Sequence, residues 1–508
     1  MEKLYNNISL EDGFASKRCD FTDTPYLKSP PEIIDVSCGR QLFVDDFLIE
    51  STDLTPEYHK AIKFEGNPVL FPERPWEIEQ SPTACPFSGG VWYDEEEGIF
   101  KIWYEGGWHR NMCYATSRDG IHWDRPELDL CEGTNKILPY EGYEDEKNFG
   151  GLDYLRPDST TVFIDYGCPK DEKYKLFLRN PGGLNYGIVA VSRDGIHFDR
   201  FKATSDVEDR STVFYNPFRK KWVYSIRRCD SETGERKRDY RECDDYLEGA
   251  SWTDDEVHDW MRCDEYDLPN PYFDRKPQLY NVDCVGYESI MLGMFQIYYG
   301  PGNAVAEAQG VPKTTALIPM YSRDGYHFTR PSREGIIGSE MLKGAWDRGY
   351  IQSVGGGTVI NGDELWIYYS AFAGDENYKG LPWTVNGCYR NGATGLAKLR
   401  RDGFVSMNGE GRLMTRKLQF FGKASLHVNV QGSVSARILD ENGELLGESA
   451  AFCGDSTNAE LAFDGLNIAD LNGKTVRIEF TVKGKLYSFG LADEKGDFGG
   501  AHAAGVVK

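Results

Sequence analysis

Carboxylates recur at one position of a strand pattern that the chain repeats five times. The five strand-like runs can be aligned on one Val in each. The residues four places before that Val are Phe87, Asp158, Asp209, Asn281 and Gly355. Carboxylates that converge from different strands can cleave a glycosidic bond, one as proton donor and another as base or nucleophile, while a third holds the donor at a raised pKa. The alternative is that Asp158 and Asp209 cap their strands and bind neighbouring loop amides.

The first run does not supply a third acid at the aligned position, because Phe87 stands there. Glu79 lies in the loop Glu77-Ile78-Glu79-Gln80 that leads into this run, and an insertion over residues 80–87 would let it reach the same site. Glu105 and Glu288 are rivals, and each also fits a surface acid or a hairpin residue.

Residues in the long loops and strand ends complete the predicted site. Sugar rings stack on flat aromatic faces, so the expected substrate contacts are Trp108, His109 and Trp383. The expected polar contacts are Arg210, Asn281 and Gln352. Packing in the core is the alternative for each Trp.

The elements that must position these residues are marked by a repeated heptapeptide. Ser117–Trp123 (SRDGIHW) returns at 192–198 as SRDGIHF and at 322–328 as SRDGYHF, with weaker echoes at 251–258 and 401–404. Each copy follows strand-like runs rich in β-branched and aromatic residues. We predict that the motif is a turn between the third and fourth strands of a unit, where Asp binds the local backbone and the aromatic residue fills the gap to the next unit. The repeat is then structural and is not the active site.

Five such units predict an all-β fold, a five-bladed β-propeller followed by a small C-terminal β-sandwich. The expected domains are an N-terminal extension over residues 1–75, the propeller over 76–405 and the sandwich over 406–508. The fifth unit runs out of strands near Leu399, so we expect the run at 42–50 to supply its closing strand.

Composition narrows the partners. The 508 residues carry a net charge of −24, with a pI near 4.9, which argues against a nucleic-acid or membrane partner and favours a neutral or weakly charged ligand. No apolar leader or long apolar run occurs, and the 12 cysteines have no metal-site spacing, so a cytoplasmic protein with reduced thiols is expected. We expect no metal or organic cofactor, and whether the chain forms a homo-oligomer is left open.

The chain also resembles a known group of proteins. Asn67–Leu70 (NPVL), Pro75-Trp76-Glu77, the heptapeptide repeats and the terminal segment resemble uncharacterised glycosidase-like proteins of the arabinanase, levansucrase and invertase superfamily, over most of residues 40 to 490. This resemblance implies a five-bladed propeller that acts largely on furanosides through an acidic triad.

In two segments the resemblance extends to positions that are catalytic in the similar proteins. The segment from Arg156-Pro157-Asp158 to Asp165 is similar to the second-blade strand of the superfamily, whose leading Asp holds the pKa of the acid. Val207–Arg210 (VEDR) is loosely similar to the Glu-Asp-Pro-Arg motif of mannoside phosphorylases, with Arg210 where those enzymes have Pro. The boxes typical of invertases are absent, so fructan specificity is not implied.

Taken together, the residues and the resemblance predict a glycoside hydrolase with Asp158, Asp209 and Glu79 as its acids. Its expected substrates are short, furanose-containing oligosaccharides or glycosides, trimmed from one end. A glycoside phosphorylase of similar architecture and a propeller that binds carbohydrate or protein without catalysis are the alternatives.

Overall fold

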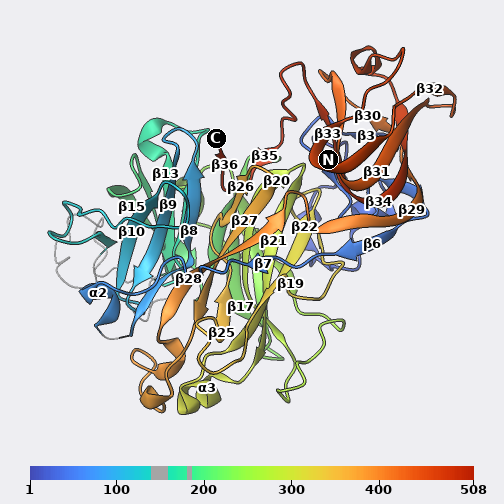
Figure 1. Cartoon of the computed structure of the whole chain (residues 1–508). Coiled ribbons are helices and arrows are strands. Elements are labelled where there is room, and N and C mark those ends of the chain that lie inside the picture. The colour runs from blue at the N-terminus through green and yellow to red at the C-terminus, as the bar shows by residue number, and fades with distance from the viewer. Residues whose placement is uncertain (80, 139–157, 180–185) are drawn as a thin grey trace.

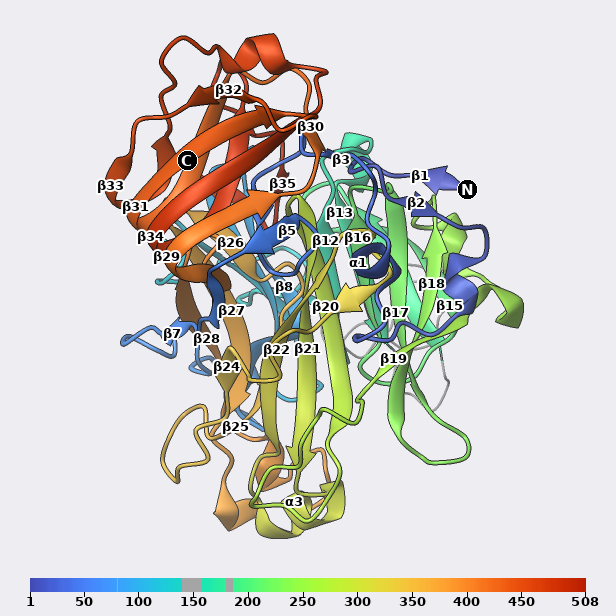
Figure 2. The same cartoon turned by 90° about the vertical axis from the view of Figure 1, so that its right-hand side faces the viewer.

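A computed structural model describes residues 1–79, 81–138, 158–179 and 186–508 (Figure 1). These residues form an all-β chain in which the helices are short, and the longest of those described is α3 (Asn303–Gln309). Sheets 1 to 5 follow one another along the chain, and a separate C-terminal lobe packs beside them (Figures 1 and 2).

Sheets 1 to 5 consist mainly of antiparallel strands in chain order. Sheet 1 contains β8 (Thr83–Asp94), β9 (Ile99–Gly106), β10 (Asn111–Ser117) and β11 (Lys136–Leu138). Sheet 2 contains β12 (Thr161–Ile164), β13 (Tyr174–Arg179), β14 (Tyr186–Ser192) and β15 (Phe198–Asp206). Sheet 3 contains β16 (Thr212–Asn216), β17 (Lys221–Cys229), β18 (Arg236–Cys243) and β19 (His258–Arg262).

The remaining sheets carry additional short strands. Sheet 4 contains β20 (Gln278–Glu288), β21 (Ile290–Gly300), β22 (Thr314–Ser322), β23 (Phe328–Thr329) and β24 (Ile337–Gly338). Sheet 5 contains β25 (Gly349–Gln352), β26 (Thr358–Asn361), β27 (Glu364–Phe372) and β28 (Gly392–Arg400). Because β8 pairs in parallel with β28, sheets 1 and 5 form one hydrogen-bonded unit.

The inner strands of neighbouring sheets contact one another. β8 contacts β12, β12 contacts β16, and β16 contacts β20, while β22 contacts β25 and β8 contacts β26 to β28. All 12 residues of β8 are buried, which fits its Gly- and Cys-containing, largely apolar sequence. The residues at the start of these strands are therefore brought together from all five sheets.

The three full copies of the heptapeptide are turns, as predicted, and they follow β10, β14 and β22. In the second copy, Asp194 Oδ1 accepts the backbone N–H groups of Ile196 and His197 at 2.8 and 2.9 Å, and Asp194 Oδ2 lies 2.8 Å from His197 Nδ1. The same bonds recur around Asp119 and Asp324.

Each turn is also fastened to the preceding sheet through a backbone carbonyl. Trp103 Nε1 of β9 donates to Gly195 O at 2.7 Å, and Trp260 Nε1 of β19 donates to Tyr326 O at 2.9 Å. Tyr368 Oη of β27 donates to Gly120 O at 2.8 Å. The repeat thus links neighbouring sheets, which explains its recurrence without a catalytic role.

The prediction that a strand over residues 42–50 closes the fifth unit was wrong. Its ends are β4 (Gln41–Leu42) and β5 (Ile49–Thr52), which pair with β34 (Val476–Ala492) and β29 (Val405–Thr415) of the C-terminal lobe. A turn separates them, because Asp45 accepts the backbone N–H of Phe47 and forms a buried ion pair with Arg323 at 2.9 Å. The strand of the N-terminal segment that pairs with β28 is instead β7 (Ile62–Lys63).

The C-terminal lobe is built on two long strands, β31 (Ser425–Asp440) and β34, which pair along their whole length. Where they cross, Gly432 faces Gly484, with φ of 121° and 129°. A Cβ on either residue would lie 2.2 Å from a carbonyl oxygen of the opposite strand, so only glycine allows this close approach.

One buried carboxylate joins the lobe to the sheets and to the N-terminal segment. Asp402 follows β28, in the weakest copy of the repeat, and receives Arg40 Nε at 3.0 Å and Ser488 Oγ at 2.6 Å. Tyr287 Oη of β20 also donates to it. Burial alone would raise the pKa of Asp402, but Arg40 and Arg401 outweigh burial and hold the pKa below its usual value.

We expect Gly195→Ala to destabilise the protein more than Gly133→Ala. Both glycines have positive φ, 79° and 72°, which costs a residue with a Cβ roughly 1–2 kcal/mol. A Cβ at Gly195 would also lie 2.7 Å from the Trp103 ring, whereas nothing lies within 4 Å of one at Gly133. Denaturant unfolding of the two variants measures the difference, and equal losses would contradict the packing role of this turn.

Asp402→Asn should destabilise the protein strongly at pH 7 and much less at acid pH. Removal of one partner from a buried ion pair costs about 3–5 kcal/mol. Because the pKa of Asp402 is lowered in the folded state, its stabilisation is complete above the unfolded pKa of about 3.9 and is lost as the pH falls through the lower folded value. Unfolding free energies of wild type and variant at pH 7 and below pH 4 test this, and a pH-independent difference would contradict it.

Candidate active site

The Arg210 guanidinium occupies the point where the starts of the inner strands meet. It is 3% exposed and donates to Ser88 Oγ at 2.9 Å and to Ser159 Oγ at 3.2 Å. It also donates to Gln352 Oε1 and packs 3.8 Å from the centroid of the Phe87 ring. One side chain from sheet 3 therefore contacts residues of sheets 1, 2 and 5.

Asp158 lies on one side of this guanidinium, in the segment that leads into β12. Its Oδ2 receives Arg179 Nη1 at 3.0 Å, and its Oδ1 receives Ser159 Oγ at 3.2 Å and lies 3.8 Å from His109 Nδ1. Burial would raise the pKa of Asp158, but His109, Arg179 and Arg210 outweigh it, so the pKa lies below its usual value. This carboxyl is held in its ionised form.

Asp283 of β20 is a second buried carboxyl close to Arg210. Its Oδ2 receives Asn281 Nδ2 at 2.8 Å and Ser353 Oγ, and it lies 3.5 Å from Ser88 Oγ. No Arg or Lys of the described residues forms an ion pair with it. Burial raises the pKa of Asp283, and the nearby hydroxyls and guanidinium groups offset this only in part. This carboxyl keeps its proton to a higher pH than an ordinary Asp.

The two carboxyls are therefore displaced in opposite directions by their surroundings. A serine joins each of them to Arg210, Ser159 on the side of Asp158 and Ser88 on the side of Asp283. Titratable groups with separated pKa values are the arrangement that general acid and base catalysis requires.

Aromatic side chains enclose the site. Trp108 is 3% exposed and stacks on Tyr389 with ring centroids 4.8 Å apart, while Phe87 and Phe372 contact its ring edge-on. Trp383 is 41% exposed and lies edge-on to His109 at 5.3 Å. Trp383 is thus accessible to a ligand, whereas Trp108 belongs to the buried wall.

Two buried donors of this site have no acceptor among the described residues. They are the Trp108 indole Nε1 and the Gln352 amide Nε2, and their residues are 3% and 0% exposed. Buried polar groups are normally satisfied. Hydroxyl oxygens of a ligand would supply the missing acceptors.

Strained backbone conformations are also concentrated at this site. Residues other than glycine seldom adopt positive φ. Six that do so belong to this site, namely Phe87 (49°), Ser88 (74°), His109 (50°), Ser159 (53°), Arg210 (65°) and Tyr350 (52°). Strain of this kind clusters at functional sites, where the surrounding contacts hold it.

The structure brings six of the predicted residues together. Asp158, Trp108, His109, Arg210, Asn281 and Gln352 all contribute to this buried cluster or its wall. Trp383 borders it. Asp209 lies next to Arg210 in the chain, but its side chain is 45% exposed and forms an ion pair with Arg227 at 3.1 Å.

Glu79 does not join the cluster. It is exposed where α2 (Pro75–Ile78) ends, because this helix turns it towards solvent. Glu105 of β9 is instead buried beside the site and accepts the backbone N–H of His109 at 3.2 Å. Glu288 lies at the far end of β20, where it pairs with Arg401.

Asp283 was not predicted, although the sequence held a signal for it. Side chains two residues apart on a strand point to the same face, so Asn281 in the aligned register also places Asp283 on the inner face of β20.

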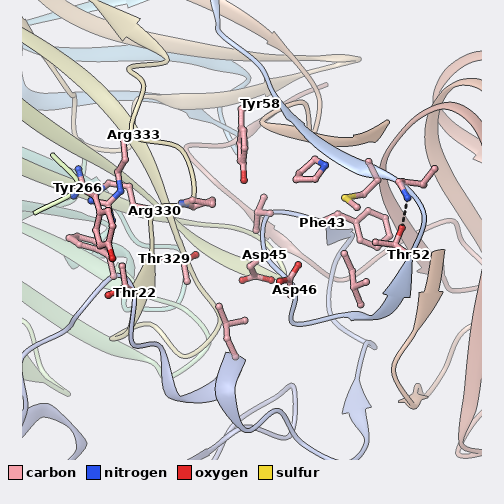
Figure 3. A pocket seen from close by; sticks show the side chains of 18 residues that line it. Thr22, Phe43, Asp45, Asp46, Thr52, Tyr58, Tyr266, Thr329, Arg330 and Arg333 are labelled. Carbon is pink, nitrogen blue, oxygen red and sulfur yellow. Dashed lines mark hydrogen bonds between the residues drawn. The ribbon is translucent and has the colours of Figure 1, made fainter. Parts of the chain in front are cut away.

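A separate cavity of about 540 Å³ lies between the N-terminal segment, sheet 4 and the C-terminal lobe (Figure 3). Its charged residues are largely paired, Asp45 with Arg323 and Arg330 with Asp267 at 2.6 Å. Tyr266 and Arg333 lie at one side of the lining and Phe43 and Thr52 at the other, as Figure 3 shows. The ion pairs connect parts of the fold. None of these lining residues other than glycine has a positive φ, although the Arg330 Nε has no acceptor among the described residues.

Two further searches cover the described residues. They contain no group of three or more His, Cys, Asp or Glu side chains placed to hold a metal ion. None of the helices within 1–79, 81–138, 158–179 and 186–508 has the length and apolar sequence needed to cross a membrane.

Comparison with known proteins finds no family and no curated sequence that matches the chain. Among solved structures, an N-acetylgalactosamine deacetylase from F. plautii, in complex with blood group B trisaccharide, is similar at 14% identity, with a TM-score of 0.45 over 70% of this chain and 96% of that one. A β-1,2-mannobiose phosphorylase from Listeria innocua has 11% identity, a TM-score of 0.43, and coverage of 67% and 96%. A family 32 β-fructofuranosidase from Bombyx mori has 9% identity, a TM-score of 0.35, and coverage of 86% and 93%. Their names describe three different reactions, all on carbohydrates.

Proposed function

We propose that this chain is a glycoside hydrolase that trims short oligosaccharides from one end. The observation that carries the proposal is the pair Asp158 and Asp283, two buried carboxyls that Ser159 and Ser88 link to Arg210 and whose pKa values are displaced in opposite directions. A furanose as the sugar follows from the resemblance of the sequence alone. The contacts between inner strands support a closed five-bladed propeller, and we take the C-terminal lobe to be its sandwich.

In the proposed reaction, Asp283 gives its proton to the glycosidic oxygen as the bond from that oxygen to the anomeric carbon breaks. Ionised Asp158 either removes a proton from the attacking water or attacks the anomeric carbon itself, after which water releases the sugar. Arg210 lowers the pKa of Asp158, whereas it offsets the effect of burial on Asp283 only in part. Half-exposed Asp209 contacts substrate hydroxyls at the entrance, and Trp383 stacks on a sugar ring.

Phosphorolysis is a second candidate, because basic side chains without carboxylate partners lie close to Asp209. The charges of both Asp209 and Arg236 act on the Tyr280 hydroxyl, so these two side chains lie near each other. Arg236 forms no ion pair among the described residues. Turnover that requires added phosphate would identify a phosphorylase. Turnover in water alone would identify a hydrolase.

The test compares Asp158→Asn and Asp283→Asn on two kinds of glycoside. Without its proton donor, Asp283→Asn should lose ~10²–10⁴-fold in kcat/KM on alkyl glycosides. It should lose far less on dinitrophenyl glycosides, whose leaving group departs without a proton. Asp158→Asn should lose activity on both kinds, because it removes the base or nucleophile. Asp199→Asn, at an exposed surface pair with Arg200, is the control that should leave both rates unchanged.

Two outcomes would refute this assignment. One is equal loss on both kinds of glycoside for Asp283→Asn. The other is near-normal turnover for Asp158→Asn with an unchanged melting temperature. Asp209→Asn should mainly raise KM, and a loss of kcat on alkyl glycosides alone would transfer the role of proton donor to Asp209. Binding of saccharides without turnover of any glycoside would favour a non-catalytic module.

A further inference from the structure

Five basic side chains next to the candidate active site form no ion pair with any carboxylate of the described residues. They are Arg210, Arg236, Arg238, Arg275 and Lys313, in a chain whose net charge is −24. Unpaired charges that are wholly or partly removed from water are costly. Retention of five of them in one region calls for a compensating negative charge.

Three of these groups surround two neighbouring tyrosine rings. The Arg236 guanidinium lies 5.2 Å from the centroid of the Tyr280 ring and 5.4 Å from that of Tyr298. Arg275 lies 4.8 Å from the Tyr298 ring, and Lys313 Nζ donates to Tyr280 Oη at 2.9 Å. The aromatic faces hold the cations in place without neutralising them.

Arg236 and Arg275 are the members that a ligand can reach. Both are half-buried, whereas Lys313 and Arg238 are 2% and 0% exposed. Arg236 donates through Nη1 to Gln278 Oε1 at 2.5 Å, and Arg275 through Nη1 to Tyr298 Oη at 3.3 Å. The Arg275 Nε has no acceptor within the described part of the chain. Each guanidinium therefore keeps donors in its planar fork for a further acceptor.

The titration of nearby groups agrees with an excess of positive charge. Burial together with Arg210 and Arg227 lowers the pKa of Arg238 to about 9. Burial would raise the pKa of Tyr280, but Lys313 and Arg236 outweigh it and lower the pKa below its usual value. Both shifts favour the form of the group that carries less positive or more negative charge.

We infer that Arg236 and Arg275 bind an oxyanion of the ligand, either the carboxylate of a uronic acid or inorganic phosphate. A guanidinium presents two parallel N–H groups that match such an oxyanion, and Lys313 and Arg238 behind the pair strengthen the positive field. The inference deepens the proposed function by naming the chemistry of the substrate or co-substrate. It differs from the neutral ligand that the overall charge suggested, because these five basic side chains have no carboxylate partner among the described residues.

Lys276 provides a matched control. It follows Arg275 directly and carries the same charge, but it is 57% exposed and pairs with Glu235 at 2.6 Å. A general effect of charge on ligand binding would appear equally in Lys276→Gln. An effect of the proposed subsite would not.

The experiment measures calorimetric affinity and melting temperature with glucuronate, galacturonate and inorganic phosphate, and with glucose, galactose and arabinose as neutral ligands. We expect one class of anion to bind the wild-type protein more tightly than any neutral sugar. Arg236→Gln and Arg275→Gln should each weaken this binding at least ~10-fold, the scale of a hydrogen bond between charged groups. Lys276→Gln should not change it, and Arg275→Lys should restore it only in part because the fork is lost.

The choice of ligands distinguishes a uronate from phosphate as the source of the oxyanion. Binding and turnover, measured separately, distinguish the oxyanion subsite from the proposed hydrolase activity. Binding of uronates identifies a carboxylate on the sugar, and binding of phosphate alone identifies a co-substrate; either supports the oxyanion subsite, even if no glycoside is turned over. Equal binding of neutral and anionic ligands would overturn the inference. So would an anion affinity that Arg236→Gln and Arg275→Gln leave unchanged, although the hydrolase would stand. Unfolded variants would be replaced by Arg236→Lys and Arg275→Lys, whose unchanged anion affinity would likewise overturn it.

Discussion

The buried guanidinium of Arg210 is the contact on which the centre of this molecule depends. It reaches Ser88 of sheet 1, Ser159 beside sheet 2 and Gln352 of sheet 5 from the start of sheet 3, and Arg238 donates to its backbone carbonyl. The positive φ of Arg210 and Ser159 shows that the backbone is held in an unfavourable conformation to make these contacts. The same charge lowers the pKa of Asp158 and partly offsets the burial of Asp283, so the support of the fold and the electrostatics of the site are one arrangement.

Charge is distributed unevenly around this centre. The exterior of the chain is acidic, yet the side chains between Arg210 and Tyr298 are an assembly of cations held by aromatic rings and carbonyl oxygens. Such a region inside an acidic protein would attract anions locally despite the net charge of −24. The net charge of the chain therefore does not determine the charge of a ligand that this region would bind.

Repetition made the all-β class and the repeated turns predictable from the sequence. The three heptapeptides share the local bonds of their Asp residues, and one alignment of strand starts selected Asp158 and Asn281, which the structure places in one buried cluster. The prediction failed where the contacts are not local. The apolar run at 42–50 has strand-like composition, but the Asp45 to Arg323 ion pair bends it and the C-terminal lobe pairs with its ends. Glu79 was chosen by proximity in the chain, and a four-residue helix that no repeat predicted turned it outwards.

Infrared difference spectra of Asp158→Asn and Asp283→Asn against the wild-type protein would follow each carboxyl group separately as the pH is raised. The central claim is that the surroundings of Arg210 separate the pKa values of these two groups. We predict that the carbonyl band of protonated Asp283 persists to a higher pH than that of an exposed Asp, and that the band of protonated Asp158 is lost at a lower pH. Loss of both bands at the same pH, or in the reverse order, would contradict the claim.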